Sequence, residues 1–297
     1  MNSHCFRFRP FSSLLGRGSL GFMLCAFWVG CSQSEQITPS PEENETSATP
    51  GTGSLTLTAN GEDFVRQGFE TKDGWAIAFD HVFVTVTEAT AYQTDPPYDA
   101  KASNALDPST VTVTQLLVDT PQVVDLAQGD SDADPIAVTT ESAPSGRYNA
   151  LVWAIAPDKA AGREYSIQLV GTATKGDRTI AFDIGFDPSF SYTCGDFVGD
   201  SRKGFLDPDA AADLEMTLHF DHIFGDGEAP ADDDINTGAL GFDPLAAVAE
   251  GDTLTTDLAT LQAKLSSEDQ ALLTGAIAGL GHVGEGHCAL TQPENNP

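Results

Sequence analysis

Positively charged side chains are scarce in this sequence. The chain of 297 residues has 14 lysines and arginines against 44 aspartates and glutamates, which gives a formal net charge of −30 at pH 7. Proteins that bind the phosphate backbone of nucleic acids need a basic surface, so this charge balance argues against a nucleic-acid partner. The same acidic excess is compatible with divalent cations, although it also serves solubility alone.

Common catalytic motifs are absent as well. The sequence contains no HExxH pair, no GxSxG nucleophile turn and no glycine-rich phosphate loop. We therefore do not expect an enzyme. One catalytic alternative stays open, a zinc-dependent hydrolase in which three protein ligands leave a position for water and Glu285 acts as the base.

The apolar stretch near the N-terminus is too short to span a bilayer and has the layout of a secretory signal peptide. Arg7, Arg9 and Arg17 precede the uncharged run LGFMLCAFWVGC, which ends at Cys31. Gly30 directly before Cys31 fits a bacterial lipoprotein signal, in which the cysteine is acylated and becomes the new N-terminus. Ordinary cleavage nearby, with export to the periplasm, is the alternative.

The next residues predict a tether and a location. Residues 31–53 contain no aromatic side chain and are rich in Ser, Thr, Pro and Glu, so this segment cannot bury enough apolar surface to order itself. Ser32 follows Cys31 in place of the aspartate that would favour the inner membrane. We expect residues 1–30 to be removed and the remainder to be an outer-membrane lipoprotein that faces the periplasm or the cell surface.

Cysteine is rare, and its positions predict a disulfide. Of five cysteines, Cys5 and Cys25 leave with the signal peptide and Cys31 is the expected lipidation site. Cys194 and Cys288 remain. In an oxidising compartment such a pair favours a disulfide over two free thiols or two metal thiolates.

Helical periodicity is lacking from about residue 54 to 190, where short apolar runs alternate with turns. In GWAIAFDHVFVTVTEATAY, apolar residues fall on both faces of a strand, which suits a central strand covered on both sides or one that changes sheets. The KGD turn between REYSIQLVGTAT and RTIAFDIGFD predicts a hairpin. Many short strands without alternating helices predict a mainly β fold, an antiparallel β-sandwich of the immunoglobulin or transthyretin type, over residues 54–190.

Residues 191–297 predict a final strand, an acidic loop and a helical region packed with the sandwich. The strand is DLEMTLHFD, and the helices are expected in FDPLAAVAE, TTDLATLQAKL and SSEDQALLTGAIAGLG. Ser266 or Ser267 is the expected N-cap of the last helix, and Gly281 lies beyond its end.

A family resemblance covers roughly residues 54–188. LTANGEDF, FDHVFVTVTEATAY, VVDLA and APSGRYNALVWAI occur in an order that resembles exported bacterial sandwich domains of uncharacterised function. The layout is also similar to the methanobactin-associated periplasmic copper-binding proteins, which bind copper through histidines and a modified tryptophan. The resemblance implies an exported sandwich and favours metal binding, but it assigns no ligand residue.

Histidine is also rare, and four of the histidines fall in two short clusters. LHFDHIFGDGE holds His219 and His222, and GHVGEGHC holds His282 and His287. Neutral imidazoles bind zinc and copper, and the glycines beside both clusters let the backbone bend. The proposed disulfide would bring the neighbours of the two clusters together. We therefore predict one transition-metal site, for zinc or copper, in which Asp221 or Glu285 is a further ligand or orients an imidazole.

Other readings of these polar residues stay open. The four histidines could instead cap loops and donate hydrogen bonds to nearby carboxylates. His81 lies among large apolar residues and is expected to be a satisfied histidine of the core or of a strand end. Calcium is a further candidate, because two loops offer alternating oxygen ligands at Asp130, Asp132 and Asp134, and at Asp232, Asp234 and Asn236. The sequence therefore predicts an exported metal-binding lipoprotein, with a structural or adhesive surface sandwich without metal as the alternative.

Overall fold

Two β-sheets and a group of short helices make up the part of the chain that the structure describes. The computed structural model describes residues 51–103, 105–195, 204–284 and 286–291. The predicted signal peptide, Cys31 and the tether up to residue 50 lie outside the described residues, as do Glu285 and the side chain of His287. The described residues belong to one compact unit.

The smaller sheet has five strands in the order β16–β15–β13–β1–β6. The pairing between β1 and β13 is parallel, and the other pairs are antiparallel. This sheet therefore joins the first strand of the fold to strands from the C-terminal third. The bounds are Thr52–Asn60 for β1, Ile136–Pro144 for β6, Ala211–Leu218 for β13, Gly281–Val283 for β15 and Gly286–His287 for β16.

The larger sheet has the order β14–β10–β9–β3–β8–β11–β17, and β2, β4 and β5 also pair with β3. A further small sheet pairs β7 (Gly146–Arg147) with β12 (Phe205–Leu206). The bounds in the larger sheet are Phe69–Glu70 for β2, Ala76–Thr94 for β3, Val111–Val118 for β4, Gln122–Asp125 for β5, Ala150–Ile155 for β8, Ile167–Lys175 for β9, Arg178–Phe186 for β10, Phe190–Cys194 for β11, Thr253–Asp257 for β14 and Ala289–Thr291 for β17.

The predicted fold class is confirmed: the chain is a mainly β sandwich with a C-terminal helical region. Side chains from both sheets meet in one core, in which Leu57 and Met216 of the smaller sheet and Val84 and Trp153 of the larger sheet are fully buried. Most strand pairs are antiparallel, but β14 joins β10 in parallel, as β13 joins β1. The KGD hairpin is also confirmed, with Lys175 opposite Arg178.

A β-bulge explains why the long strand β3 looks apolar on both faces. The register with β9 shifts between Phe79 and His81, so one extra residue changes which positions face the core. Ile77 is buried before the bulge, whereas Val82 and Val84 are buried after it. The two apolar sets in the sequence therefore point largely to the same core.

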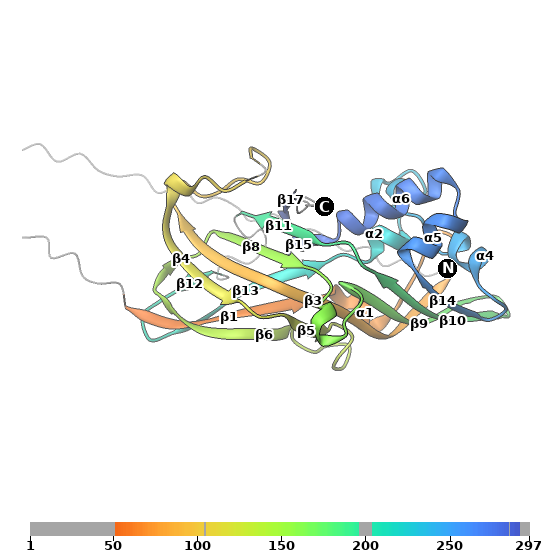
Figure 1. Cartoon of the computed structure of the whole chain (residues 1–297), viewed down its shortest axis with the longest axis horizontal. Helices are drawn as coiled ribbons and strands as arrows, with labels where there is room; N and C mark the ends of the chain where they lie inside the picture. Colours follow the sequence, from red (N-terminus) through yellow and green to blue (C-terminus); the bar gives the residue numbers. More distant parts are fainter. Residues whose placement is uncertain (1–50, 104, 196–203, 285, 292–297) are drawn as a thin grey trace, which may run out of the picture. The chain divides into compact units, whose positions relative to one another are not determined.

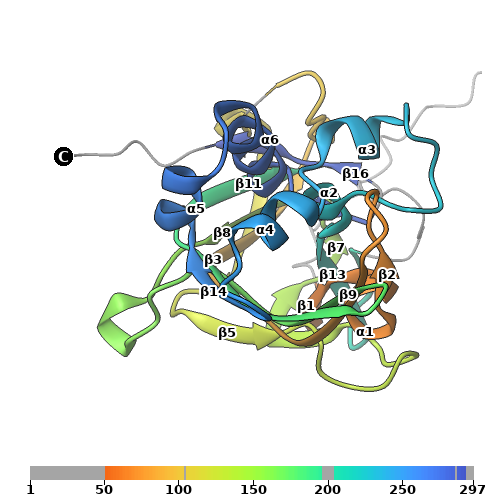
Figure 2. The same cartoon turned by 90° about the vertical axis from the view of Figure 1, so that its right-hand side faces the viewer.

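The helices from α2 onward lie together at one end of the strands, whereas α1 lies beside the strands, and Figure 2 views the molecule from the helical end (Figures 1 and 2). The three helices expected from the sequence are present, and Ser266 caps α6 by accepting from Asp269 N. Within the described part of the chain, no helix has the length and apolar character to cross a membrane. The bounds are Glu62–Gln67 for α1, Asp221–Phe224 for α2, Asp234–Gly238 for α3, Asp243–Val248 for α4, Leu258–Lys264 for α5 and Ser267–Ala278 for α6.

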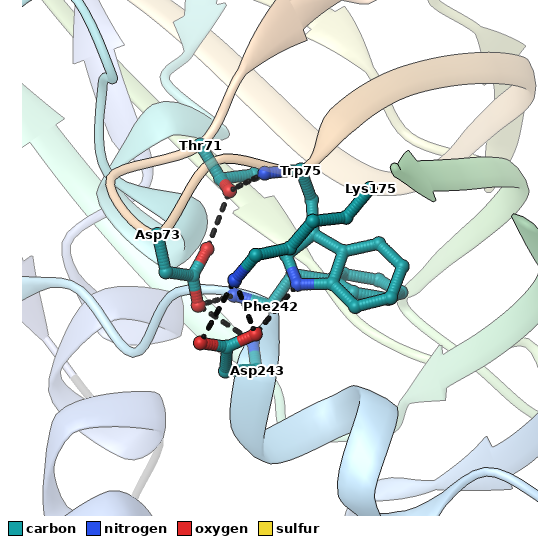
Figure 3. A network of polar contacts seen from close by, with 6 residues as sticks. All are labelled: Thr71, Asp73, Trp75, Lys175, Phe242 and Asp243. Atoms are coloured by element: carbon teal, nitrogen blue, oxygen red, sulfur yellow. Dashed lines mark hydrogen bonds and ion pairs between the residues drawn. The ribbon is translucent and has the colours of Figure 1, made fainter. Parts of the chain in front are cut away.

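A polar network attaches α4 to the larger sheet (Figure 3). Trp75 Nε1 donates to Asp243 Oδ1 over 2.7 Å, and Lys175 Nζ lies 2.9 Å from the same oxygen. Asp73 Oδ2 accepts from the backbone N–H groups of Phe242 and Asp243 at 2.8 and 2.6 Å. Burial raises the pKa of the Asp243 carboxyl, but the hydrogen bonds and the positive charge of Lys175 outweigh it, so this pKa lies below its ordinary value.

Candidate metal centre

The first histidine cluster sits where β13 ends and the backbone turns into a helix. The strand stops at Leu218, and α2 begins at Asp221, so DLEMTLHFD is extended over less of its length than expected. The N–H of His222 donates to the carbonyl of His219 over 3.2 Å, which closes the turn. As a result, one ligand atom each from His219, Asp221 and His222 lie within 4.8 Å of one another.

The second cluster reaches the first through strand pairing. His282 in β15 lies opposite Thr217 of β13. Thr217 precedes His219 by two residues, so the strand pairing brings His282 close to the first cluster. The ring centroids of His282 and His219 are 4.2 Å apart, and those of His282 and His222 are 5.1 Å apart. The predicted meeting of the two clusters is therefore present for these three imidazoles.

His287 and Glu285 complete the set of residues predicted from the second cluster. The backbone of His287 in β16 pairs with that of His282 in β15. Its side chain and Glu285 lie outside the described residues. The roles predicted for these two residues therefore stay predictions.

The Cys194–Cys288 disulfide is present, which confirms the predicted bond. Cys194 ends β11, and Cys288 lies between β16 and β17. Strand β17 pairs with β11, and Trp153 Nε1 donates to the sulfur of Cys194 over 3.3 Å. The bond therefore ties the segment after the β15–β16 hairpin to the larger sheet, whereas His282 itself is part of the smaller sheet.

Backbone carbonyls hold one nitrogen of each imidazole in the cluster. His219 Nε2 lies 3.3 Å from the Gly284 carbonyl oxygen, and His222 Nδ1 lies 3.0 Å from that of Gly279. His282 Nε2 lies 3.2 Å from the same Gly279 oxygen. A carbonyl can only accept, so the ring nitrogen that faces it carries the hydrogen. In the neutral ring, the opposite nitrogen then has the lone pair that a metal ion needs.

Thr217 and Glu215 position the carbonyl that His219 contacts. The Gly284 N–H donates to Thr217 Oγ1 over 3.0 Å. Thr217 Oγ1 donates in turn to Glu215 Oε1, which also accepts from Asn60 Nδ2. Both Glu215 and Thr217 are buried, so this chain of contacts fixes the hairpin that carries Gly284.

Glu62 is a site residue that the sequence reading missed. Its Oε2 lies 3.4 Å from His219 Nδ1, the nitrogen on the side away from Gly284. Glu62 has a backbone φ of 60°, an uncommon conformation for a residue with a side chain, and its N–H donates to Asn60 Oδ1. The only local signal is the turn sequence ANGED, which does not reveal the partner because His219 is far along the chain.

The carboxylate and the imidazole at this contact need a positive charge between them. A lone pair on His219 Nδ1 that faces the Glu62 carboxylate is repelled by it, so either a proton or a metal ion stabilises the contact. His219 is only 7% exposed, which strengthens this electrostatic interaction. Asp221 provides a second carboxylate oxygen that a cation could contact, because no donor among the described residues reaches its buried Oδ1.

An acid-lined cavity of about 820 Å³ opens beside the cluster. His219 and Asp221 form part of its wall, and no lysine or arginine is among the described residues that line it. Such a cavity concentrates cations and repels anions. The carboxylates in its lining are Glu62, Asp63, Glu70, Asp221, Asp226 and Glu228.

The structure places His81 away from the cluster and out of the core. Its side chain is 52% exposed, so His81 is not a core residue, although its ring nitrogen has a partner as expected. His81 lies beside the bulge of β3, where Nδ1 is 2.7 Å from Asp125 Oδ2 and the ring stacks on Phe83 at 5.0 Å.

Neither of the two loops considered for calcium contains a group of three converging carboxylates among the described residues. The Asn236 amide donates to the backbone oxygens of Asp226, Ala229 and Pro230, so it holds its own loop together. Within the described ranges, the residues whose ligand atoms gather in a group of three or more are His219, Asp221 and His222. This group excludes Asp130, Asp132, Asp134, Asp232 and Asp234.

Comparisons with protein-family models, with curated proteins and with solved structures gave no match for this chain.

Proposed function

We propose that this protein binds one transition-metal ion, zinc or copper(II), through His219, His222 and Asp221. The observation that carries the proposal is the convergence of these three ligand atoms within 4.8 Å, at a point where two strands and a helix meet. Two imidazoles and a carboxylate form a donor set suited to these metals. Among the described residues, this group could hold a metal ion.

The surroundings of the three ligands support the proposal. Carbonyls of Gly279 and Gly284 orient the imidazoles, as outer hydrogen bonds do in metal sites. The His282 ring packs against the ring of His219, but His282 is not a member of the group of three converging ligands. Glu62 supplies negative charge on the Nδ1 side of His219, where a cation offsets it.

The acid-lined cavity gives the site a role beyond simple retention of an ion. Six carboxylates line this cavity, and two of its wall residues, His219 and Asp221, are proposed ligands. A cation that enters the cavity therefore meets the ligands at its wall. This arrangement suits a protein that captures a metal cation from its surroundings.

Location outside the cytoplasm is part of the same proposal. The lipoprotein-like sequence up to Cys31 and the acidic tether support anchorage in the bacterial cell envelope, at the outer membrane. The Cys194–Cys288 bond supports an oxidising compartment.

Calorimetry on the metal-free protein tests the proposal. We expect zinc and copper(II) to bind with one ion per chain and a dissociation constant in the micromolar range or below, about −8 kcal/mol or stronger. His219→Ala and His222→Ala should each weaken binding by at least about 100-fold, because even groups outside the ligand shell account for about 10 to 100-fold. His81→Ala is the matched control and should leave binding unchanged.

Two results would contradict the proposed metal site. Affinity no better than millimolar, or equal affinity in wild type and both cluster variants, would remove the metal site. The structural or adhesive sandwich without metal would then be the better reading of the fold.

A further inference from the structure

An apolar groove lies beside His222 and shares no lining residue with the acid-lined cavity. It has a volume of about 720 Å³ and runs between α3 and α6, with His222 of α2 in its wall. Ile235, Leu272 and Ala276 provide apolar lining. The volume is within the range of about 300 to 1,000 Å³ that small-molecule sites occupy.

Two glycines keep this groove open. A Cβ atom added at Gly238 or at Gly275 would meet no atom within 4 Å. Gly275 lies inside helix α6, where glycine costs about 1 kcal/mol relative to alanine. Close packing does not require glycine at either position, so the effect of the missing side chains is to leave space in the groove.

The charges around the groove restrict what can occupy it. Asp234 and Glu268 are part of its lining, and no lysine or arginine is among the described lining residues. An anionic molecule would bring its charge next to these carboxylates without a basic partner, which is unfavourable. The apolar wall suits an apolar body, and the two carboxylates disfavour an anion. A nitrogen atom that donates its lone pair to a metal ion is itself uncharged, so a molecule that binds the metal through this atom is neutral there.

His222 connects the groove to the proposed metal. It is a member of the converging ligand group and also lines the groove, so an ion held by His222 would lie close to the wall of the groove. Three protein ligands leave a fourth position of a tetrahedral zinc ion open. A donor atom at the end of a groove-bound molecule could fill that position.

We infer that the groove takes a neutral aromatic molecule with a nitrogen donor, which completes the coordination of the metal. This inference rests on the proposed metal site for the donor, and on the groove alone for the apolar body. Nitrogen is the donor that suits zinc and copper(II) and brings no negative charge to Asp234 and Glu268. The protein then binds a metal together with an organic ligand.

Titration of the zinc-loaded protein with 4-phenylimidazole and with imidazole tests this inference. Both supply the same nitrogen donor, but only the first has an apolar body. We expect 4-phenylimidazole to bind at least about 10-fold tighter, since burial of a ring contributes more than 1.4 kcal/mol. Phenylacetate, which is anionic, should bind more weakly than 4-phenylimidazole.

A filled groove provides the structural control. Gly275→Leu places a side chain in the open space and should abolish the 10-fold preference while zinc and imidazole bind as in wild type. Thr274→Leu, at the exposed neighbouring position of α6, should retain the preference. Equal affinities for 4-phenylimidazole and imidazole in wild type, or an unchanged preference in Gly275→Leu, would overturn the inference.

A measurement without metal separates this inference from the proposed function. The neutral dye N-phenyl-1-naphthylamine should increase its fluorescence with the metal-free wild type and much less with Gly275→Leu. If zinc fails to bind but this difference is present, the metal proposal and the donor role fail while the apolar site stands. If zinc binds and the dye signal is the same in both proteins, the groove is not a ligand site.

Discussion

His219 Nδ1 lies 3.4 Å from Glu62 Oε2, and the opposite nitrogen of the same ring faces the carbonyl of Gly284. The Gly284 carbonyl can only accept a hydrogen bond, so Nε2 of His219 carries the hydrogen. Nδ1, which faces the Glu62 carboxylate, is then the nitrogen that can take up a proton or a metal ion. Either a proton or a metal ion at Nδ1 would offset the charge of Glu62, so an ion that His219 binds through this nitrogen would take the place of a proton. If His219 is a ligand as proposed, metal binding and proton release are coupled at this residue.

This coupling predicts a pH dependence with a definite sign. A protonated imidazole cannot act as a ligand, so zinc affinity should fall as the pH decreases through about 6.5, the ordinary range of histidine. Calorimetry at pH 7.5, 6.5 and 5.5 measures the change. An affinity that is constant over this range would exclude the histidines as ligands.

Glu62→Gln should weaken zinc binding by about 10-fold, the scale of groups that act beside the ligands. The substitution removes the negative charge that favours a cation at His219 while it keeps the size of the side chain. It should also reduce the number of protons released on binding. Titrations in two buffers with different ionisation enthalpies report that number, and Asp63→Asn is the neighbouring control because Asp63 lines the cavity without being a proposed ligand.

Replacement of Cys194 and Cys288 by alanine should lower the free energy of unfolding by roughly 4 kcal/mol, since the bond closes a long loop. The sequence separation of the two cysteines is 94 residues. Urea denaturation of wild type and of the double variant measures the loss. Thiol labelling of the denatured, unreduced mature protein checks the bond itself, because two reactive thiols per chain would show that it does not form.

The network around Asp243 predicts a small loss of stability in acid. Its pKa is lowered in the folded protein, so the stabilisation is present above the ordinary pKa of about 4 and is lost as the pH falls through the lowered value. Asp243→Asn should reduce stability at pH 7 by at most about 1 kcal/mol, since the pair with Lys175 is largely exposed. Urea denaturation at pH 7 and pH 3 should show a smaller difference at the lower pH.

Cys31→Ser should release the protein from the membrane fraction if Cys31 carries the lipid. The expectation depends on the sequence around Cys31 alone, because this residue lies outside the described part of the structure. Fractionation of cells that express wild type or the variant measures the distribution. Membrane association of both proteins in equal amounts would exclude this anchor.

The sequence by itself determined the features that depend on neighbouring residues. Alternation of apolar side chains predicted the strands, the KGD turn predicted the β9–β10 hairpin, and Ser266 marked the start of α6. Elimination of the other cysteines predicted the Cys194–Cys288 bond, and the spacing of the histidines identified both clusters. These signals are local in the chain or follow from composition.

The tertiary structure decided which distant groups share a site. Glu62 reaches His219 because β1 pairs in parallel with β13, and no periodicity in the sequence encodes that pairing. The bulge in β3 moved His81 to the surface, because one extra residue changes the face of every later side chain. The apolar groove beside His222 likewise exists only where α3 and α6 meet, since cavities depend on packing between elements that the sequence orders but does not place.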